Sequence, residues 1–259
     1  DDVMAAVTSK ITSTPELLQK ALTSMAYTRS TVNIGTIQKL LELEGYPIKP
    51  DKLEKLLEKA VLEGLLTNRM GSDSYSFAHD QIQQAAHEMV PGGRERDDFR
   101  LKMGRKLYKI GSSDKSAERD WLLFAAADHL NATTMQVNAQ EQDPLFLTKI
   151  NLEVGTRAAT IAAFATASKF LGLAMACLLH QVKDPWENEY DITLKVYQGL
   201  VNAELCQGHF EIGRGLSIRV LDHAKTAEDR LPTQISVTKA LGREAKHGDA
   251  FKLSRTALR

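Results

Sequence analysis

The most informative residues for the fold are Tyr75-Ser76-Phe77-Ala78-His79-Asp80-Gln81-Ile82-Gln83-Gln84-Ala85-Ala86. It begins as the second strand of a predicted β-hairpin, whose first strand is expected at residues 65–70 and whose turn holds Gly, Ser and Asp at residues 71–73. It continues as a predicted helix of residues 80–90, because Pro-Gly-Gly follows directly and ends helical structure. His79 and Asp80 therefore lie where a hairpin meets a helix.

The first clear helix upstream of the hairpin is predicted to open at Ser13-Thr14-Pro15-Glu16. Ser13 and Glu16 have the spacing of a capping box, and Pro15 suits a first helical turn. The leucines, alanines and methionine that follow recur at helical spacing and form one apolar stripe.

Two more helices are predicted before the hairpin, at residues 34–43 and 51–63. Each is followed by a glycine, Gly45 and Gly64, in the position that often ends a helix. Three helices and a hairpin in this order are typical of a winged helix, which we expect over residues 12–90 with the hairpin as its wing.

Residues 91–142 are predicted to be connecting helices. Helical patterning covers residues 96–110 and 117–130. The Gly-Ser-Ser sequence of residues 111–113 and the Asn-, Thr- and Gln-rich segment 131–143 are predicted to be linkers.

Residues 143–259 are predicted to form pairs of helices. The pairs are expected at residues 144–160 with 162–179, at residues 186–207 with 210–225, and from Pro232 onward. Gly208 and Gly248 are 40 residues apart and are placed at matching turns, which is typical of tetratricopeptide-like repeats. The predicted fold class is all-α with a small β-hairpin wing, a winged helix followed by an α-α superhelix.

Composition restricts the functional classes. The chain has 259 residues, with 33 basic and 33 acidic side chains and a formal net charge of zero. Nucleic-acid-binding domains are usually basic, so nucleic acid is an unlikely partner. Two cysteines make no disulfide framework, and neither a membrane span nor a signal peptide is found, so we expect a cytoplasmic protein. Both ends look cut from a longer polypeptide.

A series of motifs resembles one protein family. The motifs are Phe77-x-His79-Asp80-x-Ile82-Gln83-Gln84-Ala85-Ala86, Met103-Gly104-Arg105-Lys106-Leu107, Asp128-His129-Leu130-Asn131, Ile150-Asn151-Leu152-x-x-Gly155-x-x-Ala158, Trp186-x-x-x-Tyr190 and Gly208-x-Phe210-Glu211. From about residue 14 to residue 259 the chain resembles the predicted-ATPase region of large hybrid signalling kinases. Proteins of that family begin with a protein-kinase-like domain. A STAND-class (AAA-related) ATPase comes next, followed by helical repeats and often by a histidine-kinase module.

The resemblance implies a role for His79 and Asp80. In STAND proteins the histidine of a Met-His-Asp motif at this junction meets the phosphate of bound ADP; here Ala78 replaces the methionine. It implies that His79 senses a phosphate of nucleotide held by an absent core, and that Asp80 caps the next helix. The alternative is that His79 packs beneath the hairpin.

The resemblance also implies that residues 1–11 are the tail of the preceding ATPase lid. ATP or ADP with Mg²⁺ would be bound by the parent protein and not by this segment, which has no phosphate-binding loop and no catalytic constellation. The implied partners are the upstream nucleotide-binding core and kinase modules of the same polypeptide, together with a protein bound to the helical-repeat surface.

Other candidate sites have simpler explanations. Helix 51–63, in the place of a DNA-reading helix, carries three lysines against four carboxylates, which indicates a solvated face. Two pairs could suggest a metal site, Asp128 with His129 and Cys206 with His209, but neither has further local metal ligands. They are interpreted as structural histidines and buried free thiols. Gln83 and Gln84 are assigned to the polar face of a surface helix.

The predicted function is regulatory: the chain relays nucleotide state and partner binding within an ATP-dependent signalling protein. Two alternatives stay open. One is a DNA-binding transcription regulator of the ATP-dependent activator type, and the other is a passive helical-repeat scaffold.

Overall fold

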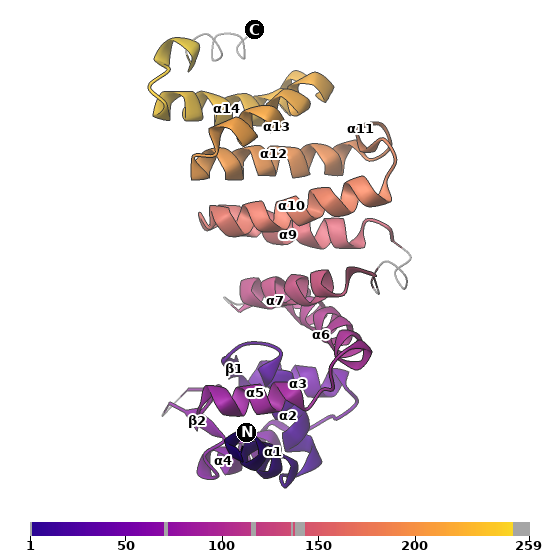
Figure 1. The fold of residues 1–259 in the computed structure, drawn as a ribbon, viewed down its shortest axis with the longest axis vertical. Coiled ribbons are helices and arrows are strands. Elements are labelled where there is room, and N and C mark those ends of the chain that lie inside the picture. Colours follow the sequence, from indigo (N-terminus) through magenta and orange to yellow (C-terminus); the bar gives the residue numbers. More distant parts are fainter. Residues whose placement is uncertain (1, 70–71, 115–117, 136, 138–142, 251–259) are drawn as a thin grey trace. The chain divides into compact units, whose positions relative to one another are not determined.

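The chain forms two compact units in a computed structural model, Asp1–Val137 (unit 1) and Asn138–Arg259 (unit 2) (Figure 1). The structure describes residues 2–69, 72–114, 118–135, 137 and 143–250. These residues are mostly helical, with one small antiparallel sheet in unit 1. The predicted class, mainly α with a small β element, is therefore confirmed.

Unit 1 has a three-stranded sheet surrounded by helices. The strand order is β1-β3-β2, with every neighbouring pair antiparallel; Val32 is opposite Tyr75 and Thr67 is opposite Ser76. The elements are α1 (Asp2–Thr12), α2 (Glu16–Ala26), β1 (Thr31–Asn33), α3 (Ile34–Leu43), α4 (Pro50–Leu62), β2 (Leu66–Asn68), β3 (Ser74–Phe77), α5 (Asp80–Glu88), α6 (Arg94–Ser113) and α7 (Arg119–Ala132).

One hydrophobic core holds α2 to α5 against the sheet. Leu22, Ile37, Leu57 and Tyr75 lie in this core, and none is more than 3% exposed. Removal of such side chains from water supplies most of the free energy that holds small domains together. The core fixes the position of the hairpin relative to α4 and α5.

The predicted boundaries of the second and third helices are confirmed. α3 ends before Gly45, whose φ is +89°, and α4 ends before Gly64, whose φ is +69°. In each case the next amide closes a hydrogen bond onto the last turn, from Tyr46 N–H to the Leu41 carbonyl and from Leu65 N–H to the Ala60 carbonyl, both at 2.9 Å. Glycine adopts this left-handed conformation without steric cost.

Three details of unit 1 were predicted wrongly. β1, which pairs with β3, was not predicted. Ser13 does not cap α2, because its hydroxyl donates to the Lys10 carbonyl and the cap position is occupied by Pro15. Residues 111–113 continue α6 instead of forming a linker. Gly111 is buried there because α7 packs closely on it: an added Cβ would lie 3.1 Å from Leu122 and Leu123.

The segment predicted as a linker at residues 131–143 is partly helical. α7 continues to Ala132, and helical residues follow at 134–135 and 137. Residues 136 and 138–142 of the predicted linker, residue 70 of the predicted first strand and residue 71 of the hairpin turn lie outside the described residues.

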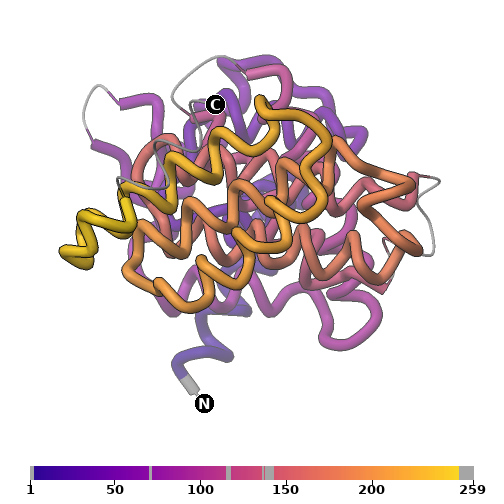
Figure 2. Tube along the Cα trace, turned by 90° about the horizontal axis from the view of Figure 1, so that it is seen from above, coloured from indigo at the N-terminus to yellow at the C-terminus, as the bar shows by residue number. Residues whose placement is uncertain are grey.

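Unit 2 consists of antiparallel helices that lie in layers in chain order (Figure 1) and overlie one another when viewed from above (Figure 2). The helices α9 and α10 pack together, α12 packs on α10, and α13 and α14 pack on α12. Their bounds are α9 (Phe146–Thr160), α10 (Phe164–Gln181), α11 (Pro185–Asn188), α12 (Tyr190–Gln207), α13 (Phe210–His223) and α14 (Ala227–Arg243).

The same turn recurs after α9, α12 and α14. Its left-handed residue is Ala162, Gly208 or Ala245, with φ of +58°, +84° and +58°. One residue later, an amide donates to the carbonyl five positions earlier, at 2.9, 3.0 and 2.9 Å. This hydrogen bond is the signature of a Schellman helix end. The same type of turn therefore follows the first helix of three successive helix pairs.

Two predictions for unit 2 were wrong in detail. Gly248 is not at the turn, because Ala245 holds the left-handed position that corresponds to Gly208. The third pair does not begin at Pro232, which lies inside α14; the helix begins at Ala227, where Thr226 and Asp229 form a capping box. Residues 251–259 of the predicted array lie outside the described residues.

Candidate functional site

The junction of β3 and α5 holds the predicted sensor residues on a rigid support. The Ala78 amide donates to the Leu65 carbonyl at 3.1 Å, which extends the hairpin by one residue. The Ile82 amide then donates to the His79 carbonyl at 3.0 Å and begins α5. On α5, Ile82, Ala85 and Ala86 are buried in the core of unit 1.

His79 and Asp80 are both exposed at this junction. The ring of His79 is therefore not packed beneath the hairpin, which was the alternative explanation. Asp80 is not the helix cap as expected: His79 occupies that position without a side-chain hydrogen bond, and Asp80 is the first residue of α5. A carboxylate in the first turn still interacts favourably with the partial positive charge of the helix end. The role of His79 and Asp80 as a phosphate sensor stays a prediction.

Gln83 and Gln84 lie in different environments on α5. Gln84 is exposed, and its side-chain amide donates to Glu88 one turn later at 2.9 Å. This arrangement agrees with the polar surface face predicted for it. Gln83 is half-buried and lines a cleft of about 360 Å³ beside Tyr27 and His129.

A cluster of aromatic side chains lies beside this cleft. The rings of Tyr27 and His87 stack with centroids 4.1 Å apart, and His129 Nε2–H donates to the Tyr27 carbonyl at 2.5 Å. Burial lowers the pKa of both His87 and His129 below the ordinary value of 6.5, because burial disfavours the protonated ring. His129 is thus a structural histidine, as predicted. Tyr27 and His87 are 60 residues apart, and no local pattern pointed to their contact.

The second pair considered for metal binding is held by other partners. His209 Nδ1 lies 2.7 Å from Glu204 Oε2, and the buried Glu204 carboxylate also accepts from the hydroxyl of Ser168. The thiol of Cys206 faces the side-chain oxygen of Asn202 at 3.8 Å. Cys206 and Cys177 are free, as predicted, but each is half-buried where a buried thiol was expected. Burial raises the pKa of the Cys177 thiol.

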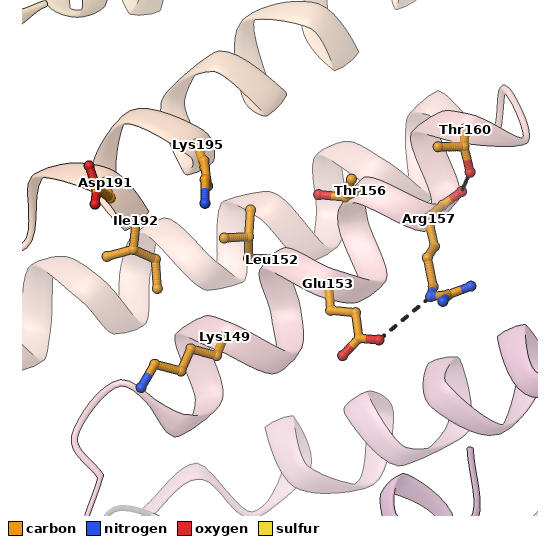
Figure 3. A pocket seen from close by; sticks show the side chains of 9 residues that line it. All are labelled: Lys149, Leu152, Glu153, Thr156, Arg157, Thr160, Asp191, Ile192 and Lys195. Carbon is orange, nitrogen blue, oxygen red and sulfur yellow. Dashed lines mark hydrogen bonds and ion pairs between the residues drawn. The ribbon is translucent and has the colours of Figure 1, made fainter. Parts of the chain in front are cut away.

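A groove of about 670 Å³ lies on unit 2 between α9 and the beginning of α12 (Figure 3). Its side chains come from one face of each helix, at spacings of three and four residues. They are Lys149, Leu152, Glu153, Thr156, Arg157 and Thr160 of α9, and Asp191, Ile192 and Lys195 of α12. The groove thus joins the first helices of two successive helix pairs.

The charges in this groove are mixed. Glu153 faces Arg157 at 3.6 Å, and Lys149 binds Asp143 at 2.6 Å. Lys149 lowers the pKa of Asp143 by hydrogen bonding. Lys195 is exposed and has no ion-pair partner within the described ranges. Such a surface offers both aliphatic contacts and charge to a polypeptide segment.

On α4 the charged side chains separate onto two strips. Glu54 and Glu58 line a cleft against the hairpin. The three lysines lie on the neighbouring strip and are absent from the lining of that cleft, and Lys59 pairs with Glu63 at 3.8 Å. The solvated face predicted for this helix is therefore acidic where it meets the hairpin.

One comparison with known proteins found a relative. The chain is 26% identical over 171 residues to "Hybrid signal transduction histidine kinase G" of Dictyostelium discoideum. The match covers 60% of this chain but 5% of that protein, so the chain corresponds to a small part of its relative. No family model and no solved structure matches. The chain is thus distantly related to a signalling kinase. In the described part of the chain, every helix is too short or too polar to cross a membrane.

Proposed function

We propose that this chain is a non-catalytic regulatory segment of a multidomain ATP-dependent signalling protein. It relays the nucleotide state of a STAND-class ATPase core, located upstream in the same polypeptide, to kinase modules elsewhere in that polypeptide. The observation that carries this proposal is the distant similarity to a hybrid signal transduction histidine kinase.

The architecture of unit 1 supports the winged-helix part of the proposal. The order α2-β1-α3-α4-β2-β3, with β1 added to a β2–β3 hairpin, is the order of helices and strands in a winged helix. In this account the unit docks on the nucleotide-binding core. α1, which packs on α5 and α2, is the end of the preceding lid.

The exposed His79 supplies the sensor. An imidazole can donate a hydrogen bond to a phosphate oxygen, and a nearby phosphate would favour its protonated form. ATP or ADP with Mg²⁺ would be bound by the upstream core, and His79 would report which phosphate is present.

The repeated turns of unit 2 support a tetratricopeptide-like array. Stacked helix pairs present the first helix of each pair along one continuous surface. The groove between α9 and α12 lies on two such helices, so it is the surface on which a protein partner would bind (Figure 3). Occupation of this groove would then bias the docking of unit 1.

Two other functions are less well supported. A DNA-binding regulator would place α4 against phosphates, and the carboxylates that line its cleft would repel them. A passive scaffold needs the groove of unit 2 and no nucleotide coupling. That alternative explains neither the exposed His79-Asp80 pair nor the kinase relative.

Sequencing the parent transcript beyond both ends of this chain tests the proposal. A phosphate-binding loop G-x-x-x-x-G-K-[ST], followed by an acidic strand within a few hundred residues upstream, is expected. A complete upstream coding sequence without such a loop would remove the sensor role and favour a scaffold.

A further inference from the structure

A cleft of about 740 Å³ lies between α4 and the β-hairpin of unit 1. Its lining contains three carboxylates, those of Glu54, Glu58 and Asp73, and no lysine or arginine. Within the described part of the chain, none of these carboxylates has an ion-pair partner. Glu54 and Glu58 are one helical turn apart and therefore point in the same direction.

The rest of the lining is largely apolar. Ile34, Val61, Leu62 and the ring of Tyr75 contribute carbon surface beside the carboxylates. The Leu62 side chain is 88% exposed, which is unusual for an aliphatic side chain on a helix whose opposite face is fully buried. The cleft thus combines an exposed aliphatic anchor with unpaired negative charge.

The carboxylates act together on the one phenol in the lining. Burial raises the pKa of Tyr75, a hydrogen bond with Asn68 opposes this increase, and the charges of Glu54, Glu58 and Asp73 add to it. Their fields therefore converge at the floor of the cleft. A cation placed there would be attracted by all three groups at once.

We infer that this cleft is a docking site for a basic segment of protein, with two or more Lys or Arg side chains opposite Glu54, Glu58 and Asp73 and an aliphatic side chain against Leu62. Charge complementarity selects this occupant over nucleic acid, because phosphates would face three carboxylates. The inference does not depend on the proposed nucleotide switch. Glu54 and Glu58 lie on α4, whereas the His79 carbonyl accepts hydrogen bonds from Ile82 and Gln83 of α5.

Fluorescence anisotropy of the whole chain with a short labelled peptide of Lys and Leu tests the inference, and the same peptide with Glu in place of Lys is the ligand control. Tight binding of the Lys peptide and weak binding of the Glu peptide are expected. The preference should decrease as salt is raised from 50 to 300 mM, because exposed charges are screened. Absence of binding by the Lys peptide would overturn the inference.

Matched variants assign the binding to the cleft. Glu54→Gln and Glu58→Gln should each weaken the Lys peptide about two- to fivefold, and Asp51→Asn, on the same helix but outside the cleft, should not. Leu62→Ala should weaken it about fivefold. All four side chains are exposed, so folding, checked by circular dichroism, should be unchanged.

Charge reversal completes the test. The double variant Glu54→Lys with Glu58→Lys should exchange the preference and bind the Glu peptide more tightly. Equal affinity of the cleft variants and Asp51→Asn would contradict the inference. So would a duplex DNA that displaces the Lys peptide and still binds after Glu54→Gln and Glu58→Gln, since this face would then belong to nucleic acid.

Discussion

Gly155 on α9 packs directly against Leu171 on α10: a Cβ atom at Gly155 would lie 2.6 Å from Leu171 Cγ. On the other side, a Cβ at Gly199 of α12 would lie 3.0 Å from Leu171 Cδ1. Leu171, which is fully buried, is thus enclosed by two helices at positions where only glycine fits without displacement. This contact joins α9, α10 and α12, the helices that bring the two walls of the groove together.

Gly155→Ala should therefore destabilise unit 2 by about 1–2 kcal/mol, because overpacking costs more than the better helix propensity of alanine supplies. Gly172→Ala, within α10 but with open space at its Cβ, should stabilise the unit by about 0.5–1 kcal/mol. Urea denaturation followed by Trp186 fluorescence, in a chain with Trp121→Phe, measures both. A Gly155→Ala variant as stable as the parent would contradict the packing described here.

The recurring turn allows a reciprocal test. Gly208→Ala should destabilise unit 2 by about 0.5–1 kcal/mol, because alanine is strained at positive φ although no atom obstructs its Cβ. Ala162→Gly, at the matching turn, should increase the free energy of unfolding by a similar amount. The same denaturation assay measures both changes. Two changes of the same sign would mean that the turns are not equivalent.

The two half-buried histidines of unit 1, His87 and His129, should make its stability depend on pH. His87 and His129 have pKa values below 6.5 in the folded state because of burial, so the unfolded chain binds more protons. Stability should therefore be constant well above pH 6.5 and decrease as the pH falls below it. Urea denaturation at pH 7.5 and 5.5, followed by Trp121 in a chain with Trp186→Phe, measures the decrease.

The matched histidine variants are His129→Gln and His79→Gln. The first should reduce this pH dependence, because it removes a half-buried group that gains a proton on unfolding. The second removes an exposed histidine of the same unit and controls for the loss of a histidine side chain as such. If His129→Gln leaves the change in the free energy of unfolding between pH 7.5 and 5.5 unaltered, groups other than His129 cause the pH dependence.

The sequence predicted elements whose ends carry local signals. Gly45, Gly64 and Pro50 mark their helix ends directly, and those ends are confirmed. β1 could not be predicted, because three residues carry too little pattern and its partner strand is more than 40 residues away. Gly111 was assigned to a linker because its neighbours are serines. A glycine is needed at this position because α6 packs closely on Leu122 and Leu123 of α7, and such a tertiary contact leaves no local sequence signal.

The candidate sites divide in the same way. The position of His79 between β3 and α5 was predictable, since both elements are marked in the local sequence. The acidic cleft was not predicted, because the net charge of α4 does not show that two of its carboxylates lie on a different side of the helix from its lysines. The spacing of Glu54 and Glu58, one turn apart and separate from the lysine strip, was the signal that could have shown it.

We propose that His79 reports bound nucleotide, and the decisive measurement is the rate of ADP release from the full-length polypeptide. His79→Ala should accelerate ADP release and raise basal kinase output, because a contact that holds the closed state is lost. Gln81→Ala, an exposed neighbour on α5, should leave both unchanged. If folded His79→Ala protein retains ADP and signals like the parent, His79 is not the sensor and the nucleotide switch proposed for this chain is contradicted.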